Sequence, residues 1–85
     1  MTGTRLDKWL FHARFCRTRE MAQAATEGGK VRLNGARVVK PGHAVRPGDV
    51  LTLALGGRVT VVKVLALAER RGGAEKARSL YEIAG

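Results

Sequence analysis

The residues of this sequence best suited to binding a charged partner are its lysines and arginines. There are sixteen of them, against seven acids, in 85 residues. Five of them fall within one stretch of fifteen residues: Arg5, Lys8, Arg14, Arg17 and Arg19. Three more flank one predicted hairpin turn: Lys30, Arg32 and Arg37. Guanidinium and ammonium groups on ordered elements match a track of phosphates, and each phosphate they neutralise releases counterions. The pattern therefore favours contact with nucleic acid.

The positive charge is concentrated in the first half of the chain. Residues 1–40 hold nine bases and three acids, which gives +6 of the total formal charge of +9. No run of five like charges occurs, unlike in a disordered basic tail. We therefore expect the cations to be mounted on folded elements.

Residues for catalysis or metal binding are scarce. The sequence contains no Walker phosphate-binding loop, no dinucleotide-binding glycine fingerprint and no zinc-protease motif. Cys16 is the one cysteine, and a catalytic cysteine needs a base and an orienting partner, whereas His12 and His43 are the only histidines. We expect Cys16 to be a small, half-buried apolar residue, and we expect no catalytic residue, no metal site and no cofactor.

Targeting and membrane segments are not evident. The first residues lack the apolar segment of a signal peptide. The longest apolar run, 64–68, is far shorter than the roughly 20 residues of a membrane-spanning helix. We therefore expect a cytoplasmic protein without a membrane partner, folded as a single domain over residues 1–85.

A first helix is predicted to begin at Thr4, where Thr4 and Asp7 fit the two ends of a capping box. Its apolar residues share one arc of about 100°, and a basic stripe lies beside them. The apolar set is Leu6, Trp9, Leu10 and Ala13, and the basic stripe is Arg5, Lys8 and His12. One helix would thus supply both a core-facing seam and a cationic face.

Several side chains of this region allow two interpretations. For His12, a solvated or core-edge position and a contact to phosphate or base both remain open. Trp9 is expected to pack in the core instead of stacking on a base. Phe11 and Phe15 lie off the apolar seam and are either second-layer core or an exposed stacking platform.

A second helix is predicted after Thr18, which is a good N-cap. Its apolar side is expected to approach the first helix and consists of Met21, Ala24 and Ala25. Its polar side consists of Arg19, Gln23 and Thr26. Gly28-Gly29 should end the helix, with one glycine in the left-handed conformation.

Strands follow, because the apolar pattern then alternates with a period of two. Asn34-Gly35 fits a type I′ hairpin turn. The predicted strands cover residues 30–33, 36–39, 50–55 and 59–67, and a closing helix covers 74–83. This order predicts an α+β fold, in which two short N-terminal helices pack on a small, mostly antiparallel sheet.

An ordered series of landmarks resembles the S4-type RNA-binding domain, which is named after a protein of the small ribosomal subunit. The series runs from about residue 4 to about residue 55: Arg5-Leu6-Asp7-Lys8-Trp9-Leu10, Arg14, Thr18-Arg19, Gly29 to Gly35, and Pro47-Gly48-Asp49. The RNA-binding unit of that family, the αL motif, is two helices packed on a β-hairpin. Residues from about 56 to 85 would add the remaining strands and the short C-terminal helix.

Within that family, the stretch from Arg5 to Phe15 followed by Arg17-Thr18-Arg19 resembles the ribosome-associated heat-shock protein fifteen group. The resemblance implies docking on the rRNA of the large ribosomal subunit, with tRNA as a second candidate partner. It also implies a part in the rescue or recycling of subunits that carry peptidyl-tRNA under stress. A related group acts in ribosome-associated quality control. Members usually continue into a long basic C-terminal extension, whereas this sequence stops at Gly85, either as a truncated chain or as a compact variant; RNA binding is expected in both cases.

By the same resemblance, eleven residues are expected to face RNA: Arg5, Lys8, His12, Arg14, Arg17, Arg19, Lys30, Arg32, Asn34, Arg37 and Lys40. We expect a monomer.

Two other functions stay open. The helix–connector–helix could be a helix-turn-helix that binds DNA, although Glu20 and Glu27 on the second helix disfavour this. The chain could also be the RNA-binding part of a pseudouridine synthase, an interpretation that rests on fold analogy alone.

Overall fold

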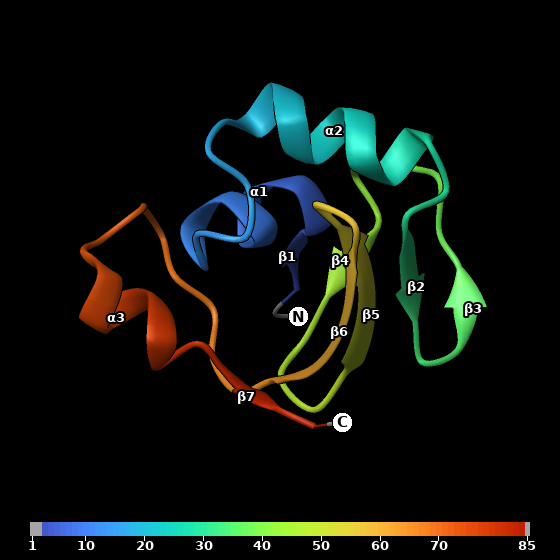
Figure 1. The fold of residues 1–85 in the computed structure, drawn as a ribbon. Coiled ribbons are helices and arrows are strands. Elements are labelled where there is room, and N and C mark those ends of the chain that lie inside the picture. Colours follow the sequence, from blue (N-terminus) through green and yellow to red (C-terminus); the bar gives the residue numbers. More distant parts are fainter. Residues whose placement is uncertain (1–2, 85) are drawn as a thin grey trace.

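Three helices and seven strands make up residues 3–84, the part of the chain that the computed structural model describes (Figure 1). The helices are α1 (Leu6–His12), α2 (Arg19–Glu27) and α3 (Ala74–Arg78). The strands are β1 (Thr4–Arg5), β2 (Val31–Leu33), β3 (Ala36–Arg37), β4 (Ala44–Val45), β5 (Val50–Leu55), β6 (Arg58–Val64) and β7 (Tyr81–Ile83). The expected α+β fold is confirmed.

All strand pairs are antiparallel within the described residues. One sheet has the order β3-β2-β5-β6-β7, and β1 pairs separately with β4. Residues that face each other across β2, β5 and β6, such as Val31 with Leu53 and Leu51 with Val62, are buried on the inner face. Figure 1 shows α1 beside this sheet and α2 across its upper end. The alternation predicted from the sequence therefore places one face of the sheet against α1.

Trp9 lies at the centre of the core, as predicted. Its side chain is fully buried, and its indole Nε1–H donates to the Ala66 carbonyl at 3.0 Å. The Phe15 ring stacks 5.9 Å from Trp9 and lies 4.6 Å from the Tyr81 ring, measured between centroids. Phe15 is therefore second-layer core, which settles one of the alternatives left open by the sequence.

The start of α1 differs from the predicted capping box. Thr4 belongs to β1, where it pairs with Val45, and the N-cap residue is Arg5, which makes no side-chain capping bond. The first N–H groups of the helix are instead satisfied by carbonyls of a neighbouring segment: Leu6 N–H donates to His43 and Asp7 N–H to Pro41. Because the backbone supplies these acceptors, no capping side chain is needed.

The second helix begins as predicted but turns a different face inward. The Thr18 hydroxyl accepts from the Met21 N–H at 3.0 Å, which confirms the N-cap. Ala22 and Thr26 are fully buried, whereas Met21 is 52% exposed. The expectation that Met21 and its alanine neighbours pack on α1 is therefore wrong, and the polar contacts that replace this packing are described below.

The closing helix is shorter than predicted. It ends at Arg78, and Tyr81–Ile83 forms β7 along the edge of β6. The Leu80 carbonyl accepts from the N–H groups of Leu65 and Ala66, which draws the chain into the sheet. Strand pairing covers an otherwise open sheet edge, and this outweighs the helical pattern of so short a segment.

The predicted glycine positions are confirmed at both turns. Asn34 and Gly35 have φ values of 52° and 88°, as a type I′ turn requires. Gly29 has φ 77° after the C-cap of α2, and a Cβ there would lie 3.2 Å from the Arg37 guanidinium carbon. Both conformation and space thus favour glycine at this helix end.

Replacing Trp9 with phenylalanine is expected to lower the free energy of unfolding by about 2 kcal/mol, because Ala66 loses its donor and the smaller ring leaves a void. Urea unfolding followed by circular dichroism measures the loss. Val59→Ala is the control, since Val59 is 68% exposed, and its effect should stay within about 0.5 kcal/mol. Equal losses from the two variants would contradict the central role of Trp9.

Candidate nucleic-acid interface

The Asp7 carboxylate organises the surface where α1 and α2 meet. Asp7 is fully buried, and its two oxygens accept hydrogen bonds from Arg5 Nε and Nη2, both at 3.0 Å. Gln23 Nε2 of α2 donates at 3.0 Å and the Lys8 N–H at 2.8 Å. Arg19 Nη2 approaches to 3.5 Å. One carboxylate therefore gathers donors from both helices.

The hydrogen bonds outweigh the cost of burying this charge. Burial alone would raise the pKa of Asp7, but the donors from Arg5, Gln23 and the Lys8 backbone, with the charge of Arg5, lower it from 3.8 to about 2. A shift of this size corresponds to about 2 kcal/mol in favour of the ionised form. Asp7 is therefore a permanent anion at neutral pH.

The same contacts explain which face of α2 is buried. Arg19 and Gln23 lie on the side predicted to be polar and outward, and both donate to Asp7. Thr26, on the same side, is buried and donates its hydroxyl to the Ala22 carbonyl at 2.8 Å. A charge-assisted network with one carboxylate at its centre thus sets the rotation of α2.

Arg5 and Arg19 keep much of their surface open to solvent. Their side chains are 49% and 41% exposed, although each is anchored on Asp7. A guanidinium has five donor hydrogens, so an arginine held at one edge still presents others to a phosphate. Lys8, on the solvent side of α1, is exposed as well. The cationic face predicted for the start of α1 is thus present, with Arg19 added from α2.

His12 departs from the predicted cationic stripe. Only 6% of the residue is exposed, and Nδ1 has no hydrogen-bond partner among the described residues. Burial lowers the pKa of His12, and the charges of Lys8 and Arg19 lower it further, against a backbone hydrogen bond at Ala68. His12 therefore lies at the edge of the core, and a neutral imidazole adds no charge to the surface.

Arg14 occupies a special place in the connector between α1 and α2. It has φ 65°, which is unusual for a residue with a side chain. Its Nε and Nη2 donate to the Gly72 carbonyl at 3.1 and 3.0 Å. In return, Arg71 donates to the Phe11 carbonyl at 3.1 Å and its guanidinium lies 4.7 Å above the Phe11 ring. Two arginines therefore fasten the loop before α3 to the end of α1.

The hairpin carries the remaining cations. Lys30, Arg32, Arg37 and Lys40 are all exposed, and Arg32 lies opposite Arg37 across β2 and β3. Asn34 has a structural task at the turn, because its Oδ1 accepts from the Val50 N–H at 2.9 Å and its Nδ2 donates to Asp49 at 3.2 Å. The turn and its cations are therefore fixed to β5.

The predicted residues thus form three groups, on α1 and α2, in the connector, and on the hairpin. Within residues 3–84, the ion pairs found are those of Asp7 with Arg5 and Arg19, so the other predicted lysines and arginines face solvent without an acid partner. The sequence pattern assigned Asp7 to a cap and Gln23 to the polar side of the second helix without joining the two, and Arg71 was not among the predicted site residues. The available signal for Asp7 was an acid placed between Leu6 and Trp9 of the apolar seam.

Metal-binding clusters and membrane-spanning helices are both absent from the same part of the chain. No group of three or more histidine, cysteine, aspartate or glutamate residues there is arranged to hold a metal ion. None of the helices in residues 3–84 combines the length and the apolar character needed to cross a bilayer.

Comparison with known proteins gives a consistent result. Residues 4–51 match the family model of the S4 domain. The chain is 47% identical over 81 residues to the heat shock protein 15 homolog of Aeromonas salmonicida, a match that covers 95% of this chain and 61% of that protein. It therefore spans about three-fifths of the length of this relative.

Two further matches cover most of the matched protein as well as most of this chain. The RQC P-site tRNA stabilizing factor of Listeria monocytogenes is 34% identical over 82 residues, 96% of this chain and 87% of that protein. The solved trimeric structure of Vibrio cholerae heat shock protein 15 superposes with a TM-score of 0.91 at 40% identity, covering 98% of this chain and 83% of that one. The resemblance to the heat-shock group drawn from the sequence is confirmed.

Replacing Asp7 with asparagine is expected to lower the free energy of unfolding by about 2 kcal/mol at neutral pH, because the donors lose a charged acceptor. The folded pKa of about 2 lies below the ordinary value of 3.8, so this stabilisation is present at higher pH and is lost as the pH falls towards 2. Urea unfolding between pH 7 and pH 2 measures it, and the variant should lose less stability over that range than the native chain.

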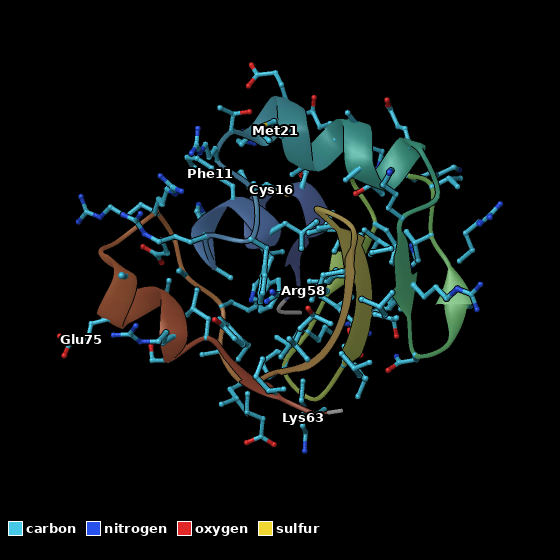
Figure 2. The ribbon with its side chains drawn as sticks, in the orientation of Figure 1. Phe11, Cys16, Met21, Arg58, Lys63 and Glu75 are labelled. Atoms are coloured by element: carbon cyan, nitrogen blue, oxygen red, sulfur yellow. The ribbon has the colours of Figure 1, made fainter. Side chains whose placement is uncertain are left out.

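Glu75→Gln is the matched control for this variant. Glu75 is exposed on α3 and makes no ion pair within the described residues (Figure 2). The control should keep the acid dependence of the native chain. The same acid dependence in Asp7→Asn would contradict the assignment.

Proposed function

This chain belongs to the S4 domain family, and on that premise we propose that it binds RNA and docks on the rRNA of the large ribosomal subunit. The observation that carries the proposal is the set of exposed cations on α1, the connector and the hairpin that make no ion pair within the described residues, beside Arg5 and Arg19 anchored on Asp7. Rigid mounting lowers the entropy lost on binding, so these groups suit a structured phosphate backbone better than flexible tails do.

The proposed task is the rescue or recycling of large subunits that carry peptidyl-tRNA under stress. Two names support it. The relatives include heat shock protein 15 of Escherichia coli, 47% identical over 78 residues, and a factor whose name assigns it to P-site tRNA in RQC. We therefore include tRNA as a second proposed partner, and we place the activity in the cytoplasm, where ribosomes work.

Recognition is proposed to act through the RNA backbone and its shape. The deep major groove of an A-form helix is too narrow for side chains to read. The eleven predicted contact residues remain our proposal, with different tasks. Exposed lysines such as Lys8 and Lys30 bind phosphates directly, whereas His12 and Asn34, which the fold engages, support the surface.

The alternatives are less well supported. A helix-turn-helix would read DNA bases with the second helix, yet its two best readers, Arg19 and Gln23, donate to Asp7. A pseudouridine synthase needs a catalytic domain, and the names of the relatives given above are not those of enzymes. We propose a binding role without catalysis.

We also propose that the chain acts as a monomer. Like-charged faces repel one another, which disfavours self-association through the RNA-binding surface. Analytical ultracentrifugation tests this point, and a trimer, the state of the Vibrio cholerae relative in its solved structure, would overturn it.

Neutralising Lys8 and Arg17 together, as Lys8→Gln with Arg17→Gln, is expected to weaken binding to purified large subunits and to make it less salt-dependent. Each lost phosphate contact should change the slope of log K against log[salt] by about 0.7 to 0.9, so two contacts change it by about 1.6. Co-sedimentation at a series of salt concentrations measures both effects. Neither side chain makes an ion pair within residues 3–84, so the fold should persist.

Lys63→Gln with Arg78→Gln removes the same charge from β6 and α3 and serves as the control. Figure 2 shows Lys63 at the end of the molecule away from α2. A binding loss in the control as large as in the test pair would misplace the interface. Preference for duplex DNA over rRNA in a competition assay would reverse the choice of nucleic acid.

A further inference from the structure

The apolar side of α2 faces outward, beside the connector and the β5–β6 turn. Because Asp7 draws the opposite side of the helix inward, Met21 remains 52% exposed and Ala25 only partly buried. Figure 1 shows the turn between β5 and β6 rising towards α2. A hollow of about 510 Å³ lies between this turn, the connector and α2.

The hollow combines an apolar floor with a cationic rim. Its lining consists of Phe15, Cys16, Met21, Ala25, Leu55 and Gly56, together with Arg14 and Arg17. Burial raises the pKa of the Cys16 thiol, so the floor carries no thiolate. In Figure 2, Met21 on α2 and Cys16 in the connector lie on the same side of the molecule. The lining includes two arginines and no acid.

We propose that this hollow receives a single unstacked base of an RNA strand, with Arg14 and Arg17 binding the phosphates on either side of it. The inference rests on the proposed function and deepens it. It adds a binding site for unpaired nucleotides to a surface that otherwise binds the phosphate backbone of RNA. Bulges and loops offer such bases, and proteins receive them against aromatic, apolar and guanidinium surfaces.

The chemistry of the lining selects this occupant. An unpaired nucleotide is an apolar, flat group flanked by negative charges, which matches an apolar floor between two cations. Met21 suits a base of any identity, because its flexible and polarizable side chain adapts to different shapes. A second copy of the chain would instead bring its own cationic surface against these arginines.

The rim is also ordered before RNA arrives. Arg14, which lines the hollow, has φ 65°, and two of its donors are held by the Gly72 carbonyl, so its conformation is fixed by the fold. Gly56 has φ 60° with no atom within 4 Å of the position of a Cβ, so the side of the hollow formed by the β5–β6 turn is open. A preformed site lowers the entropy lost on binding.

Two model RNAs test the proposal: a fully paired duplex of about 20 base pairs, and the same duplex with one unpaired 2-aminopurine. The native chain should bind the bulged duplex about tenfold more tightly, and the 2-aminopurine fluorescence should change on binding. Two variants address the hollow without changing charge. Met21→Gln removes the apolar contact, and Ala25→Leu fills the space; both should bring the affinity ratio close to one.

Ile83→Gln is the control, because Ile83 is 61% exposed on β7 and does not line the hollow. It should keep the native ratio, and circular dichroism should show all variants folded. An unchanged ratio in folded Met21→Gln and Ala25→Leu would overturn the proposal while leaving the proposed RNA binding intact. Failure of the native chain to bind either RNA or the large subunit would overturn both. Self-association lost in Met21→Gln would assign the hollow to a second copy instead.

Discussion

The fold and the surface both depend on one buried anion, the carboxylate of Asp7. A charge placed in the interior is costly unless it is paired and fully hydrogen-bonded. Here the required donors come from Arg5, just before α1, and the backbone of Lys8 on α1, and from Arg19 and Gln23 on α2. Satisfying Asp7 therefore fixes the two helices relative to each other. The same contacts place two arginines at the surface, with their side chains 49% and 41% exposed.

This constraint also determines which face of α2 packs against α1. Hydrophobic burial alone would turn Met21 towards α1, since burying a methionine side chain gains about 2 kcal/mol. The charge-assisted bonds to Asp7 need Arg19 and Gln23 on that side instead, and the helix cannot present both faces inward. The polar network prevails, and Met21 is left 52% exposed beside the connector. The hollow beside Met21 is thus a direct consequence of the buried charge.

Local features were predictable from the sequence where no distant segment competes for the same residues, as β4 does for Thr4, and distant pairings were not predictable. The Thr18 cap and the Asn34-Gly35 turn depend on neighbouring residues, and the structure contains both. The strand at Tyr81–Ile83 forms by pairing with the edge of β6. The hydrogen bonds from Arg14 to the Gly72 carbonyl join residues 58 positions apart. Helical periodicity carries no information about such partners. For the same reason the sequence indicated which side chains are basic, but not which of them the fold already uses.

The division between arginine and lysine on this surface follows from geometry. Where a cation also holds the fold together, at Arg5, Arg14 and Arg19, the residue is an arginine, whose planar group bonds an oxygen at one edge and leaves other donors free. A lysine ammonium is a compact point charge without such a second edge. An 85-residue chain has little interior in which to build a site. Residues that stabilise the fold and remain charged at the surface allow so small a domain to keep a large docking face.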